Sequence, residues 1–105
     1  MKTLLCLSVY VLTAISVTYG NKFQIVYNKD NYEYKVAYST VEIYNNTNKI
    51  IFKGYTDKYG RIIIKLSEGS YQGIVYYHAQ KWKAIFILDQ NESLKTLGLE
   101  EKNKL

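Results

Sequence analysis

The sequence predicts an all-β fold, a seven-stranded antiparallel β-sandwich that follows an N-terminal signal peptide. Short runs rich in Ile, Val, Tyr and Phe recur about every ten residues, and clusters of Asn, Asp, Lys and Gly separate them. No long segment after residue 20 has a helical period. Seven short runs with hairpin spacing are typical of two antiparallel sheets packed face to face.

Residues 1–20 have the pattern of a secretory signal peptide. Lys2 supplies a positive start, an uncharged and largely apolar stretch follows, and the small residues Thr18 and Gly20 stand before the expected cleavage point. We expect cleavage before Asn21 and a secreted, periplasmic or cell-surface location. Retention as a membrane anchor is the alternative, although the stretch is at the short end of the roughly 17–25 residues that a membrane span needs.

Composition limits the class of protein. The 105 residues allow one small domain, and cleavage would remove Lys2, which lowers the formal net charge of +5 by one unit. Cleavage would also remove Cys6, the only cysteine. A mature chain without cysteine excludes thiol catalysis, zinc–thiolate sites and disulfide scaffolds. The aromatic residues, among them the ten of the 12 Tyr that lie beyond residue 20, are therefore expected to fill the core.

The predicted strands alternate apolar and polar residues. They cover residues 23–27, 32–38, 41–44, 50–56, 61–66, 70–77 and 82–88. Alternation places Phe23, Ile25 and Tyr27 on one face of the first strand, and it separates a tyrosine-rich face from a charged face in the second. In the fifth strand, Ile62 and Ile64 are expected to point into the core and Ile63 to point outward.

The turns between these strands have recognisable chemistry. The Asn-rich segment 45–49 tolerates positive φ angles and suits a hairpin. In the segment 57–60, the Asp57 side chain can accept bonds from the backbone ahead of it, and Gly60 can take a left-handed conformation. Gly69 closes the next tight connection, and His78 begins the last one.

The sandwich domain is expected to span residues 21–89, and residues 90–105 are expected to form a charged, loosely held C-terminal tail. Three spaced leucines among its charges allow at most a turn or two of helix, ended by Gly98.

A motif in the middle of the chain consists of a strand ending in Thr56-Asp57, two further residues and Gly60, a strand of alternating apolar residues, and the step from Gly69 to Tyr71. In this order and spacing it resembles the carboxypeptidase regulatory-like domains. The resemblance implies a transthyretin-like, or prealbumin-like, sandwich that serves as an accessory module. It covers roughly residues 22–88 and carries no catalytic residues over.

No arrangement of residues in the sequence predicts catalysis, a cofactor or a metal site. His78 is the only histidine and has no carboxylates at ligand spacing around it. Asp57 is explained as a turn residue, and no Gly-x-Ser-x-Gly nucleophile motif is present. We therefore expect that the protein is not an enzyme.

Planar rings that point outward are the best candidates for a binding surface, because they combine an apolar face with a polar tip. We select Tyr55, Tyr76 and Trp82 as this candidate surface. Basic residues among the aromatics also suggest nucleic acid, but the export signal argues against such a partner, and a weak contact with anionic glycans or lipid headgroups stays open.

The favoured function is a non-catalytic secreted module that recognises an extracellular protein or glycan. A structural or assembly component that pairs through an exposed edge strand is the alternative. Asn45 and Asn91 each begin an Asn-x-Ser/Thr triplet and are candidate N-glycosylation sites.

Overall fold

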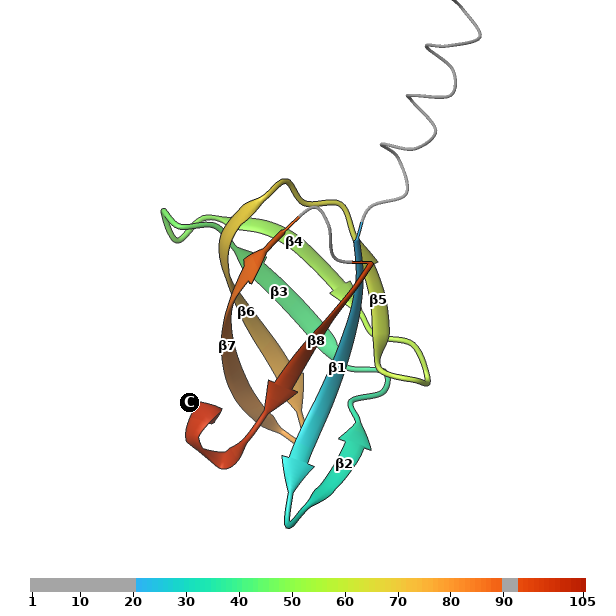
Figure 1. Ribbon diagram of the computed structural model, residues 1–105. Coiled ribbons are helices and arrows are strands. Elements are labelled where there is room, and N and C mark those ends of the chain that lie inside the picture. The colour runs from blue at the N-terminus through green and yellow to red at the C-terminus, as the bar shows by residue number, and fades with distance from the viewer. Residues whose placement is uncertain (1–20, 90–92) are drawn as a thin grey trace, which may run out of the picture.

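The chain forms two facing β-sheets in the computed structural model, which describes residues 21–89 and 93–105 (Figure 1). The strands are β1 (Asn21–Lys29), β2 (Tyr32–Lys35), β3 (Thr40–Tyr44), β4 (Ile50–Tyr55), β5 (Arg61–Ile64), β6 (Gly69–Tyr77), β7 (Gln80–Leu88) and β8 (Leu94–Leu99), and a short 3-10 helix, η1 (Glu101–Asn103), follows. The predicted β-sandwich is confirmed. The expected signal peptide, residues 1–20, lies outside the described residues.

Each sheet has four strands. One has the order β4-β3-β6-β7, with antiparallel pairing throughout. In the other, β1 pairs with β5 along its first half and with β2 along its second half, both antiparallel, while β8 runs parallel to β1 on its opposite edge. Figure 1 shows the second sheet in front of the first, so that the inner face of each is covered by the other.

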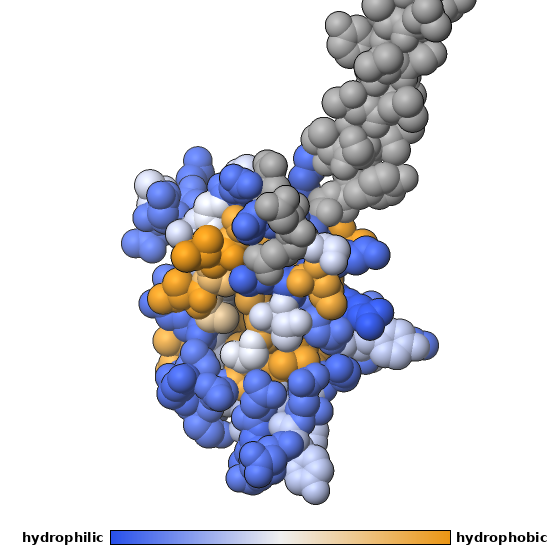
Figure 2. Space-filling view, in the orientation of Figure 1, coloured by the Kyte–Doolittle hydropathy of each residue, from blue (hydrophilic) through white to orange (hydrophobic). Residues whose placement is uncertain are grey.

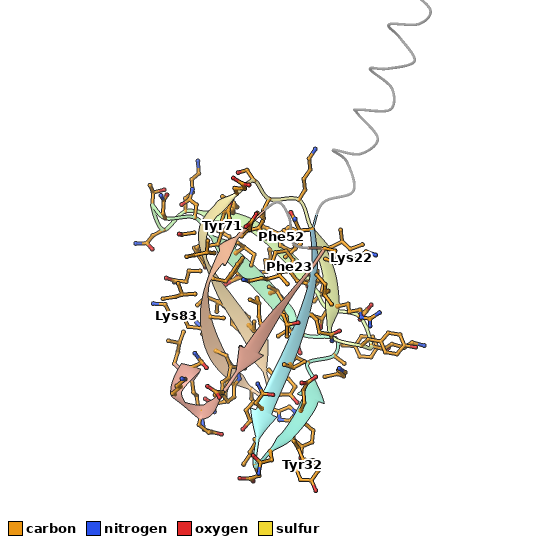
Figure 3. All side chains as sticks on the ribbon, in the orientation of Figure 1. Lys22, Phe23, Tyr32, Phe52, Tyr71 and Lys83 are labelled. Carbon is orange, nitrogen blue, oxygen red and sulfur yellow. The ribbon has the colours of Figure 1, made fainter. Side chains whose placement is uncertain are left out.

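The core lies between the sheets and is built largely from alternate residues of the strands, although β1 is buried on both faces from Phe23 to Tyr27 and β2 contributes no buried residue. Phe23 and Ile25 are fully buried, as period-two alternation predicts, and Tyr27 is 9% exposed. The ring of Phe23 meets that of Phe86 edge-on, with centroids 5.5 Å apart, and Phe86 stacks on Tyr71 at 5.7 Å. Figure 3 shows Phe23, Phe52 and Tyr71 pointing into this space. Aromatic residues therefore fill the upper half of the core in this view.

The prediction of a loosely held tail is wrong for the described residues 93–105, and the turn or two of helix that the sequence allowed before Gly98 is not formed there. Residues 94–99 form an eighth strand, β8, whose six residues pair in register with β1 from Lys22 to Tyr27. Leu97 and Leu99 are buried in the core because they alternate toward the opposite sheet. The sandwich domain thus extends beyond the expected boundary at residue 89.

The second predicted strand is shorter than the expected segment 32–38 and has no buried face. β2 ends at Lys35, and all four of its residues are exposed, because β2 pairs only with the far end of β1 and projects beyond the opposite sheet (Figure 1). Tyr38, expected on the strand, has a φ of 52° and is 75% exposed. The three tyrosines of this segment are therefore exposed, whereas Val36, on the same predicted face, is fully buried.

Candidate binding surface

The turn motif begins with Thr56, which connects two loops. Its hydroxyl donates to the carbonyl of Val36 at 2.7 Å and accepts the backbone N–H of Ser39 at 2.9 Å. Thr56 is 3% exposed, so its polar atoms are satisfied inside the protein. The Thr56 side chain therefore holds the segment between β2 and β3 against the end of β4.

Asp57 and Gly60 shape the connection from β4 to β5. The Asp57 Oδ1 atom accepts the N–H groups of Tyr59 at 2.8 Å and Arg61 at 2.9 Å, and these bonds hold the pKa of the carboxyl below its usual value. Gly60 has a φ of 76°, which confirms the expected left-handed conformation. Its carbonyl accepts the N–H of Ile25 at 2.8 Å, so this turn packs directly on β1.

The second half of the motif leads into β6. Gly69 opens the strand, and the Tyr71 hydroxyl donates to the carbonyl of Ser67 at 2.7 Å. This bond joins Ser67, in the connection between β5 and β6, to Tyr71 in β6, and so holds the connection against the strand. The contacts of Thr56, Asp57, Gly60 and Tyr71 are thus those of a structural motif.

The outer face of the β4-β3-β6-β7 sheet carries the aromatic surface. Thr40 on β3 lies opposite Tyr55 on β4 and opposite Tyr76 on β6, so the two predicted tyrosines share one face and one cross-strand row, on either side of Thr40. Tyr44 is on the same face, two residues beyond Glu42. Tyr55 is 71% exposed and Tyr76 is half-buried. We call this surface, defined by Tyr44, Tyr55 and Tyr76, the tyrosine face.

Glu42 organises the tyrosine face. Its Oε1 atom accepts the hydroxyls of Tyr76 at 3.0 Å and Tyr44 at 3.2 Å, and its Oε2 atom lies 3.8 Å from the Lys53 ammonium. The hydrogen bond to Glu42 and burial raise the pKa of the Tyr76 hydroxyl, and burial and then the same carboxylate raise the pKa of Tyr44. The two rings are therefore anchored at their polar tips.

Positive charge surrounds these rings. Lys81 lies opposite Tyr76 on β7, and its ammonium is 5.5 Å from the centre of the Tyr76 ring. Lys83 extends outward from β7 on the left of Figure 3. Because the side chain of Glu42 is only 12% exposed, the charge presented to solvent on this face is mainly that of the lysines.

Trp82 does not belong to this surface, which corrects the prediction. It is 3% exposed, its indole N–H donates to the carbonyl of Tyr77 at 3.0 Å, and its ring lies 5.2 Å from that of Tyr27. Trp82 alternates with Lys81 and Lys83 along β7, so it faces the core. Its spacing with Ala84 and Phe86 was the sequence signal for burial.

A groove of about 560 Å³ adjoins Tyr55 where β4 and β5 lie at neighbouring sheet edges. We call it the β4–β5 groove. Its lining includes Lys22, Tyr55, Asp57, Arg61 and Ile63. Lys22 on β1 lies opposite Ile63 on β5, and Ile63 is 60% exposed, as its predicted outward direction requires. The groove therefore combines an aromatic ring, an apolar side chain and groups of both charges.

The remaining candidate residues have local roles. His78 is exposed and stacks on Tyr77, with ring centres 3.9 Å apart. Asn45 Oδ1 accepts the N–H and hydroxyl of Thr47 at 3.0 and 2.7 Å, which shapes the loop before β4, whereas Asn91 lies outside the described residues. Within residues 21–89 and 93–105, no three side chains are grouped as a metal site, and no helix has the length and apolarity to cross a membrane.

Sequence reasoning missed Glu42 and Lys22. Both owe their position to cross-strand pairing, Glu42 between β4 and β6 and Lys22 beside β5. The partners of an outward-facing residue depend on strand order, which period-two patterns do not contain. No protein family model matches the chain, and no curated protein matches its sequence.

Proposed function

We propose that the protein is a secreted, non-catalytic binding module that recognises an extracellular glycan or protein through the tyrosine face. The proposal includes the removal of residues 1–20 as a signal peptide and a relationship to carboxypeptidase regulatory-like domains. The support for this relationship is the motif from Thr56 to Tyr71, whose parts occupy the ends of β4, β5 and β6 in order.

The observation that carries the proposal is a pair of tyrosines, Tyr44 and Tyr76, whose hydroxyls Glu42 anchors on the same face as the exposed ring of Tyr55. Rings that are held before a ligand arrives lose little conformational entropy on binding, and each offers an apolar face beside a polar edge. Tyr55 has the most exposed ring of the three tyrosines. Lys81, beside Tyr76, and Lys53, beside Glu42, add positive charge to the tyrosine face. This combination suits sugar rings and polar protein surfaces.

Binding to a glycan array and capture from a host surface extract test the proposal, with Tyr55→Ala as the variant. We expect saturable binding by residues 21–105 and at least about tenfold weaker binding by the variant, since ring stacking contributes more than 1 kcal/mol. Tyr32→Ala is the matched control, because Tyr32 is 68% exposed and lies at the tip of the β1–β2 hairpin (Figure 3). Absence of any saturable ligand for the folded protein would contradict the proposal.

The second candidate function is assembly through the part of the β7 edge beyond Trp82, because residues 104–105 already pair with the edge at Lys81 and Trp82. Ile85 is 74% exposed and Ile87 is 68% exposed on this edge strand, and Figure 2 shows hydrophobic residues gathered over the upper end of β7. Edge pairing predicts oligomers that grow with concentration in size-exclusion chromatography with light scattering. Ile85→Lys should abolish them and Ile63→Lys, on the other sheet, should not. A monomer at all concentrations would exclude this candidate.

A further inference from the structure

The β4–β5 groove contains two cationic side chains that no carboxylate neutralises by contact. Within the described part of the chain, neither Lys22 nor Arg61 forms an ion pair with an acidic residue. Both side chains lie on the outer face of the β1-containing sheet, since Lys22 and Gln24 on β1 are opposite Ile63 and Arg61 on β5. They are therefore diagonal neighbours facing the same side.

Arg61 is held in one orientation. Its Nε–H donates to Gln24 Oε1 at 3.0 Å, and its guanidinium lies 5.7 Å from the centre of the Tyr59 ring. Gln24 is itself fixed, because its amide nitrogen donates to the carbonyl of Tyr59. The bond to Gln24 uses only Nε, and no hydrogen bond within the described residues occupies the two terminal nitrogens of Arg61. A fixed guanidinium suits a carboxylate, which it binds through paired N–H groups.

The other lining groups fit a sugar ring. Tyr55 is exposed and Ile63 is 60% exposed, so the groove offers apolar contact for the C–H face of a pyranose. Asp57 uses Oδ1 for two backbone N–H groups, whereas Oδ2 accepts no hydrogen bond within the described residues and is available to a hydroxyl. A carboxylate in the lining disfavours a polyanion such as nucleic acid, but it suits a ligand that carries both an acid group and hydroxyls.

Resting on the binding function proposed above, we propose that the β4–β5 groove binds an acidic sugar residue. Lys22 and Arg61 hold the sugar carboxylate, and Tyr55 and Ile63 contact the sugar ring. Asp57 accepts a hydrogen bond from a sugar hydroxyl. The site continues the tyrosine face, since Tyr55 belongs to both. The ligand class is thus a carboxylate-bearing glycan, either a uronic acid or a sialic acid.

Calorimetric titration of residues 21–105 with a trigalacturonic acid and with its methyl ester tests the proposal, because the ester keeps the rings and hydroxyls but has no charge. Sialyllactose and lactose form the second pair and distinguish the two sources of the carboxylate. We expect the acid of at least one pair to bind about tenfold or more tightly than its neutral partner, as charge-assisted hydrogen bonds are lost in the latter. Lys22→Gln and Arg61→Gln should each lower the affinity for the acid by about tenfold, because each removes a charge-assisted hydrogen bond to the carboxylate.

Lys49→Gln is the control for general electrostatic attraction, because Lys49 is an exposed lysine in the loop before β4. Circular dichroism confirms that each variant is folded. Equal affinity for acid and neutral forms, or an equal effect of Lys49→Gln and Lys22→Gln, would overturn the inference. If none of these sugars binds while the array detects a ligand that requires Tyr55, the inference fails and the proposed function stands. If the array and extract also give no ligand, both fail.

Discussion

At the scale of single residues, the turn between β4 and β5 depends on one glycine. Gly60 has a φ of 76°, and a Cβ atom at this position would lie 2.6 Å from the carbonyl oxygen of Ile25 and 3.0 Å from the nitrogen of Val36. Both neighbours are backbone atoms, so no side-chain movement relieves the contact. The glycine is required by its conformation and by the close approach of β1.

Gly60→Val should therefore lower the free energy of unfolding by about 3 kcal/mol or more, from strain at positive φ together with overpacking. Urea unfolding measures this change. Gly60→Ala and Gly73→Ala form a matched comparison, because a Cβ at Gly73 meets its nearest neighbours at 3.6 Å or more and no positive φ is involved, so only the Gly60 variant should be strongly destabilised. A neutral Gly60→Val would show that the turn is not built as described.

A second residue-scale prediction concerns Tyr27 and Glu101. The Tyr27 hydroxyl donates to Glu101 Oε1 at 2.7 Å, and this bond, with burial, raises the pKa of Tyr27 to about 12. A phenol whose pKa is higher in the folded state contributes stability that is complete below its unfolded pKa and is lost as pH rises through the folded value. We expect stability to fall between pH about 10 and about 12.

Comparison of urea unfolding at pH 9 and pH 12 tests the role of this hydroxyl, with Tyr27→Phe as the control. The phenylalanine variant lacks the titrating group and should lose less stability over this interval, although the other tyrosines contribute to both proteins. Identical pH dependence of the two proteins would contradict the role given to Tyr27.

At the scale of the element, β8 makes the largest difference between prediction and structure. The charged residues of segment 90–105 obscured a short strand pattern in which Leu97 and Leu99 are two residues apart. β8 pairs with β1 in parallel, and the two strands are far apart in the sequence. No hairpin turn joins them, so the residues beside β8 contain no turn pattern that would indicate this pairing. By contrast, the hairpin strands and the turn at Gly60 were predictable, since their signals lie in neighbouring residues.

Leu99→Ala tests whether β8 is part of the core. Leu99 is fully buried, so we expect a loss of about 2–5 kcal/mol in the free energy of unfolding. Leu94→Ala in the same strand is the control, because Leu94 is 44% exposed and should change stability by less than about 1 kcal/mol. Equal, small effects would mean that the C-terminal segment is loosely held after all.

The candidate site divides in the same way between predictable and unpredictable residues. The outward directions of Tyr55, Tyr76 and Ile63 followed from alternation within their own strands. The position of Glu42 beneath two tyrosine hydroxyls and the approach of Lys22 to β5 required strand order. Trp82 was misassigned because its ring chemistry was given more weight than its inward spacing.

At the scale of the whole molecule, the sandwich leaves two seams between its sheets. One lies between β4 and β5 and holds the β4–β5 groove. The other lies between β7 and β8, and its lower end is closed by the chain terminus, where the Leu105 N–H donates to the carbonyl of Lys81 at 2.8 Å (Figure 1). The tyrosine face continues into the first seam through Tyr55. Binding is thus assigned to the outer face of the β4-β3-β6-β7 sheet and to its β4 edge, and the candidate assembly surface to the upper part of its β7 edge.

The central claim is that ligands bind at the tyrosine face and the groove beside it. Nuclear magnetic resonance of isotope-labelled residues 21–105, titrated with the trigalacturonic acid or with the best glycan from the array, tests this directly. We predict that amide shifts change along β4, β5 and the neighbouring parts of β3 and β6, and that β2 and β8 stay unchanged. A footprint confined to the β7 edge around Ile85 and Ile87, or no shift change at millimolar ligand, would contradict this prediction.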